Sequence, residues 1–310
     1  MKKIIITGPT GAIGQALVRE CLNRGDEVYV ICRPDSKRSQ TLPVHNRLHI
    51  VQADLRKLDM AEEHLPHDCN VFYHLAWLGT EKQENRYNVA IQEQNIRYTL
   101  DAVDLAHECG CTTFIGAGSQ AEYGRIEGKL TADTPCFPDN AYGIAKLCAG
   151  QMTRLKAHQY GMRHIWPRIL SVYGPYDGKQ TLVMSVILQL LRGEVPKCTK
   201  GEQLWDFLYA GDAAGILYVL AEKGKDGKVY CIGRGVAKPL WTYVLQIKDA
   251  VNPSLVVEFG SVPYTYQQVM YLCADNTDIV KDLGYTYQYT FYEGIIKTVE
   301  WCREHFDWRG

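Results

Sequence analysis

Hydrophobic positions in the first 118 residues alternate between two spacings. Short apolar runs at KKIIIT (2–7), EVYVIC (27–32), LHIVQA (48–53), NVFYHLA (70–76) and TTFIGAG (112–118) predict buried parallel strands. Between them, apolar residues at helical spacing predict helices over 12–24 and about 82–108. This alternation predicts an α/β fold with a doubly wound parallel sheet. A generic α/β domain that binds no nucleotide is still open on this pattern alone.

The pattern changes after Tyr173-Gly174-Pro175. Helical stretches near 180–192, 211–223 and 239–250 alternate with short strands, and a last helix is predicted over about 292–306. No repeat and no linker rich in proline or serine separates the two halves. We therefore predict a first domain over 1–172, to which a later segment of about 211–232 returns, and a smaller lobe over 173–310.

Composition and charge exclude several classes of protein. The chain has 310 residues, of which 46% are hydrophobic and 22% charged, so it can bury a core without disulfides. Its net charge of −1 provides no basic field for nucleic acid or an anionic membrane. No apolar run is long enough to span a bilayer, and the N-terminus passes directly into a strand instead of a signal peptide. We therefore expect a cytoplasmic protein with no nucleic-acid or membrane partner.

The cysteines do not indicate a disulfide framework or a metal site. There are eleven, an odd and scattered set, which predicts reduced thiols. The one close pair, Cys109 and Cys111, lacks a second pair or a nearby histidine doublet, so we expect no metal.

A glycine-rich loop, TGPTGAIG (7–14), joins the first predicted strand to the first predicted helix. Gly8 permits a tight turn, Gly11 lets the backbone approach a pyrophosphate, and Gly14 lets the helix pack on the strand. The helix N-terminus offers unpaired N–H groups to the phosphates. Thr10 and Ile13 belong to the same loop. The strand–loop–helix context favours a dinucleotide site over a plain glycine-rich turn.

The end of the second strand favours NADP over NAD. Chains that prefer NAD usually carry an acidic residue there, which accepts a hydrogen bond from the adenine ribose. Here the position is Cys32, followed by Arg33 and, a few residues later, Arg38, which suit a 2′-phosphate. The alternative is a solvated basic loop, in which Asp35 could still reach a ribose.

A tyrosine, a lysine and a serine form the candidate catalytic set. In NAYGIAK (140–146), Tyr142 and Lys146 lie one helical turn apart on one face. A phenol has a pKa near 10, and a neighbouring ammonium lowers it. Ser119 follows the fifth predicted strand, at the edge of the sheet where ligands bind. The competing interpretation is that Tyr142 is a core aromatic residue and Ser119 a strand-end hydroxyl.

With these motifs, the chain resembles the extended short-chain dehydrogenase/reductase family of nucleotide-sugar epimerases, dehydratases and reductases, with a Rossmann domain and a C-terminal substrate-binding lobe. The marks that carry the resemblance are TGPTGAIG (7–14), AD-L (53–55), HLAW (74–77), GSQAEYG (118–124), YGIAK (142–146), PRILSVYGP (167–175), WDFLYAGDAA (205–214) and VYCIG (229–233).

The resemblance implies a role for each matching residue. Asp54 and Leu55 would border the adenine, while Leu75, Ala76 and Trp77 would line the cofactor cleft. Tyr142 would be the acid/base, Lys146 would bind the nicotinamide ribose, and Ser119 would hydrogen-bond the reacting oxygen. The family's usual dimer, a four-helix bundle, would pair the helix over 82–108 with the helix that begins at Asn140.

Departures from the family pattern narrow the reaction. Sugar 4,6-dehydratases of the family carry Asp-Glu directly after the serine or threonine, where this chain has Gln120 and Ala121, so dehydration is disfavoured. Glu122 comes one position too late and is expected to point away. The candidate substrate residues are Ser119, Gln120, Ser171 and Trp205. Ser171 replaces the family's usual Asn, and Trp205 its usual Arg; Trp205, like Trp77, could instead be a packing residue.

The first functional hypothesis is an NADPH-dependent 4-ketoreductase that acts on a nucleotide-linked deoxyhexulose. It rests on similarity to the family's reductases that make deoxysugars such as CDP-abequose. The alternatives are a nucleotide-sugar 4-epimerase with bound NAD and a non-enzymatic cofactor-sensing regulator on the same fold. The base, the sugar and the product's stereochemistry depend on loops around 176–180, 197–205 and 263–271.

Overall fold

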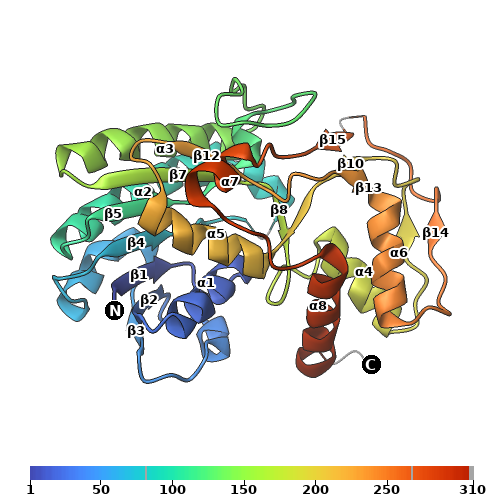
Figure 1. Ribbon diagram of the computed structural model, residues 1–310, viewed down its shortest axis with the longest axis horizontal. Coiled ribbons are helices and arrows are strands. Elements are labelled where there is room, and N and C mark those ends of the chain that lie inside the picture. The colour runs from blue at the N-terminus through green and yellow to red at the C-terminus, as the bar shows by residue number, and fades with distance from the viewer. Residues whose placement is uncertain (81, 267, 307–310) are drawn as a thin grey trace.

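A central parallel sheet organises the computed structural model, which describes residues 1–80, 82–266 and 268–306 (Figure 1). The strand order is β3-β2-β1-β4-β5-β7-β12, with the short strand β6 beside β7. Their bounds are β1 Lys3–Thr7, β2 Glu27–Cys32, β3 Leu48–Gln52, β4 Val71–His74, β5 Thr113–Gly116, β6 Gly118–Ser119, β7 Arg163–Ile169 and β12 Val229–Ile232. The order reverses between β1 and β4, which is the position where doubly wound sheets bind ligands. The predicted fold class is confirmed.

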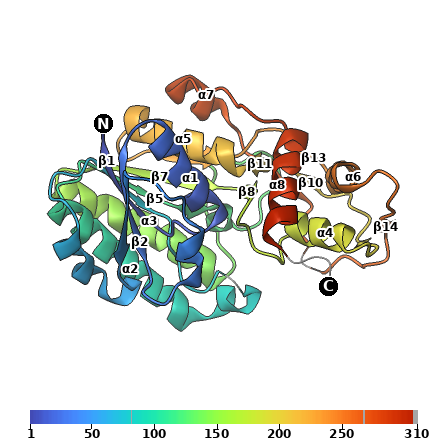
Figure 2. The ribbon, with the colours of Figure 1, turned by 90° about the horizontal axis from the view of Figure 1, so that it is seen from below.

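Helices cover both faces of this sheet (Figure 2). Helix α1 (Ala12–Asn23) packs with α5 (Ala210–Lys223) on one face, and α2 (Val89–Glu108) packs with α3 (Ala141–Gln159) on the other. Strand residues alternate between the two faces, so Ile4 and Ile6 contribute to the core under α1 and α5, whereas Ile5 contributes to the core under α2.

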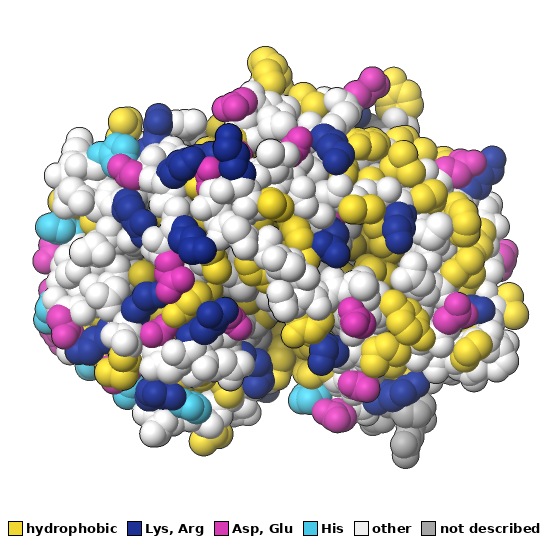
Figure 3. Space-filling view, viewed as in Figure 1, with side chains coloured by type: hydrophobic (Ala, Val, Ile, Leu, Met, Phe, Trp, Pro, Cys, Tyr) yellow, Lys and Arg dark blue, Asp and Glu magenta, His cyan; other side chains and the backbone are white. Residues whose placement is uncertain are grey.

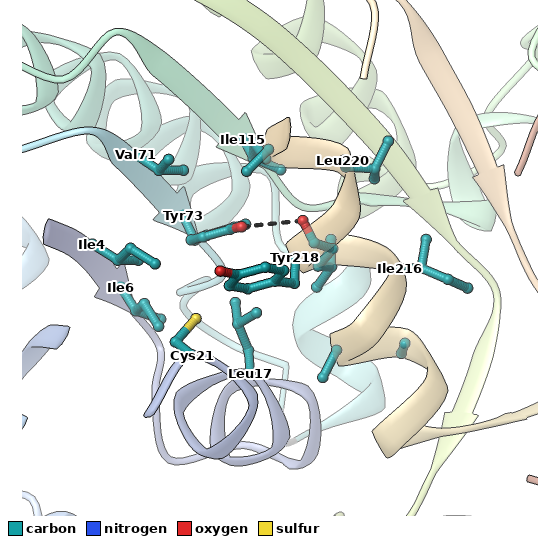
Figure 4. Close-up of a cluster of buried hydrophobic side chains, with 14 of the residues drawn as sticks. Ile4, Ile6, Leu17, Cys21, Val71, Tyr73, Ile115, Ile216, Tyr218 and Leu220 are labelled. Atoms are coloured by element: carbon teal, nitrogen blue, oxygen red, sulfur yellow. Dashed lines mark hydrogen bonds between the residues drawn. The ribbon is translucent and has the colours of Figure 1, made fainter. Parts of the chain in front are cut away.

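The core under α1 and α5 is shown in Figure 4. Leu17 and Cys21 lie one helical turn apart on α1 and face Ile4 and Ile6 of β1. Tyr73 of β4 is fully buried there, and its hydroxyl donates to the backbone carbonyl of Leu217 at 3.1 Å. This hydrogen bond satisfies a buried phenol and joins the centre of the sheet to α5.

The second group of elements lies to the right in Figure 1. Helices α4 (Leu182–Leu191), α6 (Leu240–Val251) and α8 (Phe291–His305) share a separate hydrophobic core. The short strands are β8 Ser171–Tyr173 with β11 Phe207–Tyr209, β9 Lys197–Cys198 with β14 Glu258–Phe259, and β10 Leu204–Trp205 with β13 Lys238–Pro239 and β15 Tyr271–Leu272. Helix α7 (Thr277–Leu283) returns to pack on α5 and β12. Helix α5 and strand β12 pack with elements of the first 172 residues; the boundary of the two domains itself stays a prediction.

The helix predicted over about 82–108 is wrong at its start. A 3-10 turn, η3 (Gln83–Tyr87), precedes α2, and the two are separated by Asn88. The Asn88 carboxamide oxygen accepts the backbone N–H of Ile91 at 3.2 Å and thereby caps α2. Apolar spacing alone did not reveal this break, although an asparagine is a typical N-cap residue.

The surface shows no field of a single charge sign on the face drawn in Figure 3. Basic and acidic side chains are interspersed there, and hydrophobic side chains are most frequent over the second group of elements. Among the described residues, no helix combines the length and the apolar character needed to cross a membrane.

Candidate active site

A cavity of about 780 Å³ runs from the carboxyl edge of the sheet into the second group of elements. Its wall on the sheet side includes Leu75, Trp77, Ser119, Tyr142 and Lys146. Opposite these it is lined by residues of later segments, among them Val183, Ser171, Trp205, Phe207, Leu240 and Val244. The three candidate catalytic residues therefore share one cavity with the candidate substrate residues.

The glycine loop has the geometry of a phosphate cradle. Gly8 has φ +70°, and a Cβ there would lie 2.7 Å from the backbone nitrogen of Ala76, so only glycine is tolerated. A Cβ at Gly11 would meet nothing within 4 Å, so the backbone faces open space. Gly11 caps α1 without a side-chain hydrogen bond, which leaves the first N–H groups of the helix available to an anion. These residues suit the pyrophosphate of a dinucleotide.

Strand β4 holds this loop in place. His74 is 2% exposed, and its Nδ1 lies 3.0 Å from the Thr7 hydroxyl oxygen. The same hydroxyl accepts the backbone N–H of Ala76 at 3.3 Å. Burial lowers the pKa of His74 to about 3, so the imidazole is neutral at physiological pH. Leu75 and Ala76 are thereby fixed beside Gly8, and Ile13 lines the cavity from the other side of the loop.

The residues assigned to the adenine end of the cofactor lie at the ends of β2 and β3. Cys32 is buried, and burial raises the pKa of its thiol to about 11, so it supplies no negative charge. Arg33 is exposed beside it. Asp54, which precedes Leu55, forms an ion pair with Arg56 (Oδ1–Nε 2.8 Å), and this hydrogen bond lowers the pKa of Asp54 to about 2. A 2′-phosphate would meet Arg33 without a competing carboxylate at position 32.

Arg38, unlike Arg33, donates hydrogen bonds to two backbone carbonyls in the described part of the chain. Its Nη2 donates to the backbone carbonyl of Thr10 at 2.7 Å and to that of Tyr176 at 2.9 Å. Tyr176 has φ +67° and follows β8. Arg38 thus connects the glycine loop to a segment that lies 138 residues after Arg38 in the chain. A role of Arg38 toward a 2′-phosphate stays a prediction, because in this arrangement the guanidinium already has two acceptors.

Local structure brings Ser119, Tyr142 and Lys146 together. Ser119 ends β6 and caps the 3-10 turn η4 (Gln120–Glu122), while Asn140 caps α3 and places Tyr142 in its first turn. Lys146 Nζ lies 5.9 Å from the centroid of the Tyr142 ring. It also lies 3.7 Å from the centroid of the Trp77 ring and donates to the carbonyl of Ala117 at 2.6 Å.

Burial has the largest effect on the pKa values of Tyr142 and Lys146. Burial raises the pKa of Tyr142, so the lowering expected from the Lys146 ammonium is not found in the cofactor-free protein; the nearby Ser119 hydroxyl and the charge of Arg86 act to lower this pKa. Burial lowers the pKa of Lys146 to about 7, although the charge of Glu122 opposes this. Without a bound cofactor, Lys146 therefore loses its proton near neutral pH, within the range in which a proton-transfer site works best.

Replacing Lys146 by methionine is expected to stabilise the cofactor-free protein most at low pH. The pKa of Lys146 is about 7 in the folded state and near 10.5 when unfolded, so between these values the unfolded chain binds more protons and wild-type stability rises with pH. Methionine has no such dependence. The difference in thermal midpoint, variant minus wild type, should therefore be largest at or below pH 7 and shrink toward pH 10. A difference independent of pH would contradict the depressed pKa.

The candidate substrate residues lie on the cavity wall. Trp205 Nε1 donates to the hydroxyl of Ser171 at 2.7 Å, so the two residues that replace the family's usual Arg and Asn form one pair. Trp77 Nε1 donates to the carboxamide oxygen of Gln92 at 2.8 Å, and its ring meets that of Tyr142 edge-on, with centroids 6.0 Å apart. Gln120 also lines the cavity. Each tryptophan therefore both packs and carries a satisfied indole N–H.

The prediction that Glu122 points away from the cavity is confirmed. Its carboxylate accepts the backbone N–H of Ser119 at 2.7 Å, Trp166 Nε1 at 3.1 Å and Arg168 Nε at 2.7 Å. Glu122 thus supports the serine turn from behind. In the part of the chain that the structure describes, no cluster of His, Cys, Asp or Glu could hold a metal ion.

Arg86 is a residue of the site that was not predicted from the sequence. Its guanidinium carbon lies 5.0 Å from the centroid of the Tyr142 ring, and the side chain lines the cavity. Arg86 belongs to η3, inside the stretch that the hydrophobic spacing had assigned to a continuous helix. The only signal that could have revealed it is Asn88, which marks the start of α2 and leaves the preceding residues outside the helix.

Comparisons with known proteins agree with this geometry. The NAD dependent epimerase/dehydratase family matches residues 4–233. The chain is 32% identical to the dTDP-glucose 4,6-dehydratase of Shigella flexneri, a match that covers 99% of this chain and 94% of that protein. A solved UDP-N-acetylglucosamine 4-epimerase from Methanobrevibacter ruminantium M1, in complex with UDP-N-acetylmuramic acid, is similar with a TM-score of 0.88 at 22% identity, covering 98% of this chain and 99% of that one.

A further solved structure, MoeE5 in complex with UDP-glucuronic acid and NAD, is similar with a TM-score of 0.83 at 25% identity, covering 98% of this chain and 100% of that one. The matched family spans the glycine loop, the serine turn and the tyrosine–lysine helix. The resemblance to extended short-chain dehydrogenases/reductases is thus confirmed, and the protein is an enzyme that belongs to the NAD dependent epimerase/dehydratase family.

Proposed function

We propose that this enzyme is a nucleotide-sugar 4-epimerase, which oxidises a ring carbinol of a nucleotide-linked sugar and reduces it again. The observation that carries the proposal is the convergence of Ser119, Tyr142 and Lys146 in a cavity that reaches from the glycine loop into the second group of elements. Relatives that are named for nucleotide-sugar substrates support the substrate class. Membership of an enzyme family argues against the regulator hypothesis.

Dehydration is not supported by the residues behind the serine, although several relatives are named 4,6-dehydratases. Loss of water needs an acid and a base near the sugar. Here Gln120 cannot exchange a proton near neutral pH, Ala121 has no functional group, and the carboxylate of Glu122 is committed to Arg168. The cavity retains the groups for hydride chemistry and lacks those for elimination at this turn.

The proposed reaction assigns a separate role to each residue of the site. When bound, the nicotinamide cofactor accepts and returns a hydride. Tyr142 takes the proton of the sugar hydroxyl on oxidation and gives it back on reduction. Ser119 orients the reacting oxygen, and Lys146, in its protonated form, stabilises the Tyr142 phenolate and binds the ribose. Gly8, Gly11, Gly14 and the N-terminus of α1 would hold the pyrophosphate, with Trp77 as one wall of the cleft.

A second candidate is the NADPH-dependent 4-ketoreductase predicted from the sequence. One observation favours it: position 32 is an uncharged thiol beside the exposed Arg33, a pair that suits a 2′-phosphate better than a ribose hydroxyl. The Nη2 hydrogen bonds of Arg38 to Thr10 and Tyr176 weaken the same argument, because they direct part of this guanidinium toward the glycine loop and not toward the phosphate. The cofactor is therefore the property that best separates the two candidates.

The experiment compares both reactions on purified protein. An epimerase is expected to interconvert UDP- or dTDP-linked hexoses with NAD and without net formation of NADH, and to retain deuterium placed at C4 of the sugar. A reductase would instead consume NADPH in proportion to a 4-keto sugar and bind NADPH more tightly than NADH in a titration. Absence of any hydride transfer with these substrates and cofactors would contradict both.

We also propose a homodimer through α2 and α3. These helices pack on each other and carry exposed apolar side chains, including Ile144, Met152 and Leu155 on α3 and Val89 at the start of α2. Apolar side chains that gather on one helix pair are typical of surfaces that bind a partner. Pairing of this surface with its copy would bury them in a four-helix bundle.

A further inference from the structure

The cavity has few charged side chains, and only some of them have hydrogen-bond partners within the protein. Among the described lining residues the basic side chains are Arg86, Lys146 and Lys197, and the one acidic side chain is Asp177. Lys146 donates to the carbonyl of Ala117, and Asp177 accepts from Gly178 and Thr181 of its own turn. Arg86 and Lys197 form no hydrogen bond or ion pair with another described residue. Two cations therefore face the cavity without an anionic partner in the described part of the chain.

These two cations belong to different regions. Arg86 precedes α2 and lies over the ring of Tyr142, at the end of the cavity where the reaction takes place. Lys197 begins β9, which pairs with β14 among the elements at the right of Figure 1. If the reacting carbon lies at Tyr142 and Ser119, as the proposed function requires, the nucleotide and its diphosphate extend away from Tyr142 toward the lobe. The diphosphate can then meet Lys197 but leaves Arg86 unpaired.

Space for a substituent exists beside Arg86. An adjoining pocket of about 420 Å³ is lined by Arg86, Gln120, Arg125, Asp139 and Tyr266, and it shares Arg86 and Gln120 with the main cavity. Arg125 Nε is paired with Asp139 at 3.0 Å, so among the described cations of this pocket it is Arg86 whose donors stay available for a ligand. Arginine stays charged at every physiological pH, and its planar fork matches a carboxylate in bidentate fashion.

We propose that Arg86 determines the specificity of the enzyme by binding a carboxylate of the sugar, and that the substrate is a nucleotide-linked sugar acid such as a uronic acid. The inference rests on the proposed function, because it places the sugar at Tyr142. A substrate-bound Arg86 becomes desolvated and forms charge-assisted hydrogen bonds, with the Gln120 amide as a second donor beside it.

The test compares matched acidic and neutral ligands in binding, so that it does not depend on turnover. Calorimetry would give Kd for UDP-glucuronic acid and UDP-glucose, and for the dTDP forms of both, with wild type, Arg86→Gln and Arg86→Lys. Loss of a hydrogen bond to a charged group predicts that Arg86→Gln weakens the acid by about 10- to 100-fold and the neutral sugar by less than about 3-fold. Arg86→Lys should recover part of the loss, because it keeps the charge without the fork.

The control variant is Arg97→Gln, an exposed arginine of α2 that pairs with Asp101 at 3.0 Å and should leave both affinities unchanged. Wild-type preference for the neutral sugar, or no binding of any of the four ligands, would overturn the inference. An equal effect of Arg86→Gln on acid and neutral sugar would also overturn it, and would assign Arg86 to Tyr142 instead. If the acid binds through Arg86 but no hydride is transferred, the proposed function fails and the specificity assignment stands.

Discussion

Replacing Tyr142 by phenylalanine is expected to lower turnover by about 10²–10⁴-fold, which is the usual contribution of a positioned general acid or base. The phenol is the only group of the set that can pass a proton to the sugar oxygen, since Ser119 polarises and Lys146 acts through the phenol and the ribose. Phenylalanine preserves the edge-on contact with Trp77, so the cavity should keep its shape. Cofactor affinity should be nearly unchanged, because the glycine loop is untouched.

The competing interpretation, a purely structural Tyr142, makes the opposite prediction. It expects a lower thermal midpoint with turnover per folded molecule preserved. The control is Tyr160→Phe at the opposite end of α3, which removes a hydroxyl that donates to Asp104 at 2.8 Å and should leave turnover intact. Ser119→Ala should be slow but milder than Tyr142→Phe. Near-normal turnover of Tyr142→Phe on the physiological sugar would refute the mechanism.

The sheet of the first domain could be predicted because most of its strand residues are buried. EVYVIC became β2 over Glu27–Cys32, and the apolar run of the first strand became β1, since a parallel strand covered on both faces needs an unbroken hydrophobic segment. Strand β7 was not predicted. Its segment RHIWPRI contains Pro167, which normally argues against an interior strand, yet β7 lies between β5 and β12.

Local motifs of the site were also predictable, whereas its long-range contacts were not. Gly8 and Gly11, or Tyr142 and Lys146, are close in the chain, so spacing alone brings them together. Arg38 lies 138 positions before its partner Tyr176, and Arg86 contacts the ring of Tyr142 from the 3-10 turn η3. The periodicity of the sequence does not predict these long-range contacts, because they depend on where the whole fold places β8 and η3.

Glu122 illustrates the same limit, since its sequence position indicated only that it would point away. The structure shows a buried ion pair with Arg168 at 2.7 Å, with side-chain exposures of 0% and 5%. The same carboxylate accepts from Ser119 and Trp166. A buried pair of this kind adds little net stability as a whole, but removal of one partner leaves an uncompensated charge in the interior.

Replacing Glu122 by glutamine is therefore expected to lower the free energy of unfolding by about 3–5 kcal/mol, although the side chain keeps its shape. The amide can still accept from Ser119 but cannot neutralise Arg168, and its NH₂ group must face another donor, either Arg168 or Trp166. Urea unfolding of the cofactor-free protein measures the change. The matched control is Glu20→Gln, which breaks the exposed i,i+4 pair with Arg24 and should cost about 0.3–0.5 kcal/mol.

A double variant separates the charge from the packing. Glu122→Gln combined with Arg168→Met removes both charges, so its stability should exceed that of Glu122→Gln alone, and the two single effects should not add. If Glu122→Gln costs less than about 1 kcal/mol, the pair is not the buried charge network described above, because uncompensated interior charges cost more than this. If the double variant instead loses the sum of both single effects, each residue contributes by packing alone, and the turn that holds Ser119 does not depend on their ion pair.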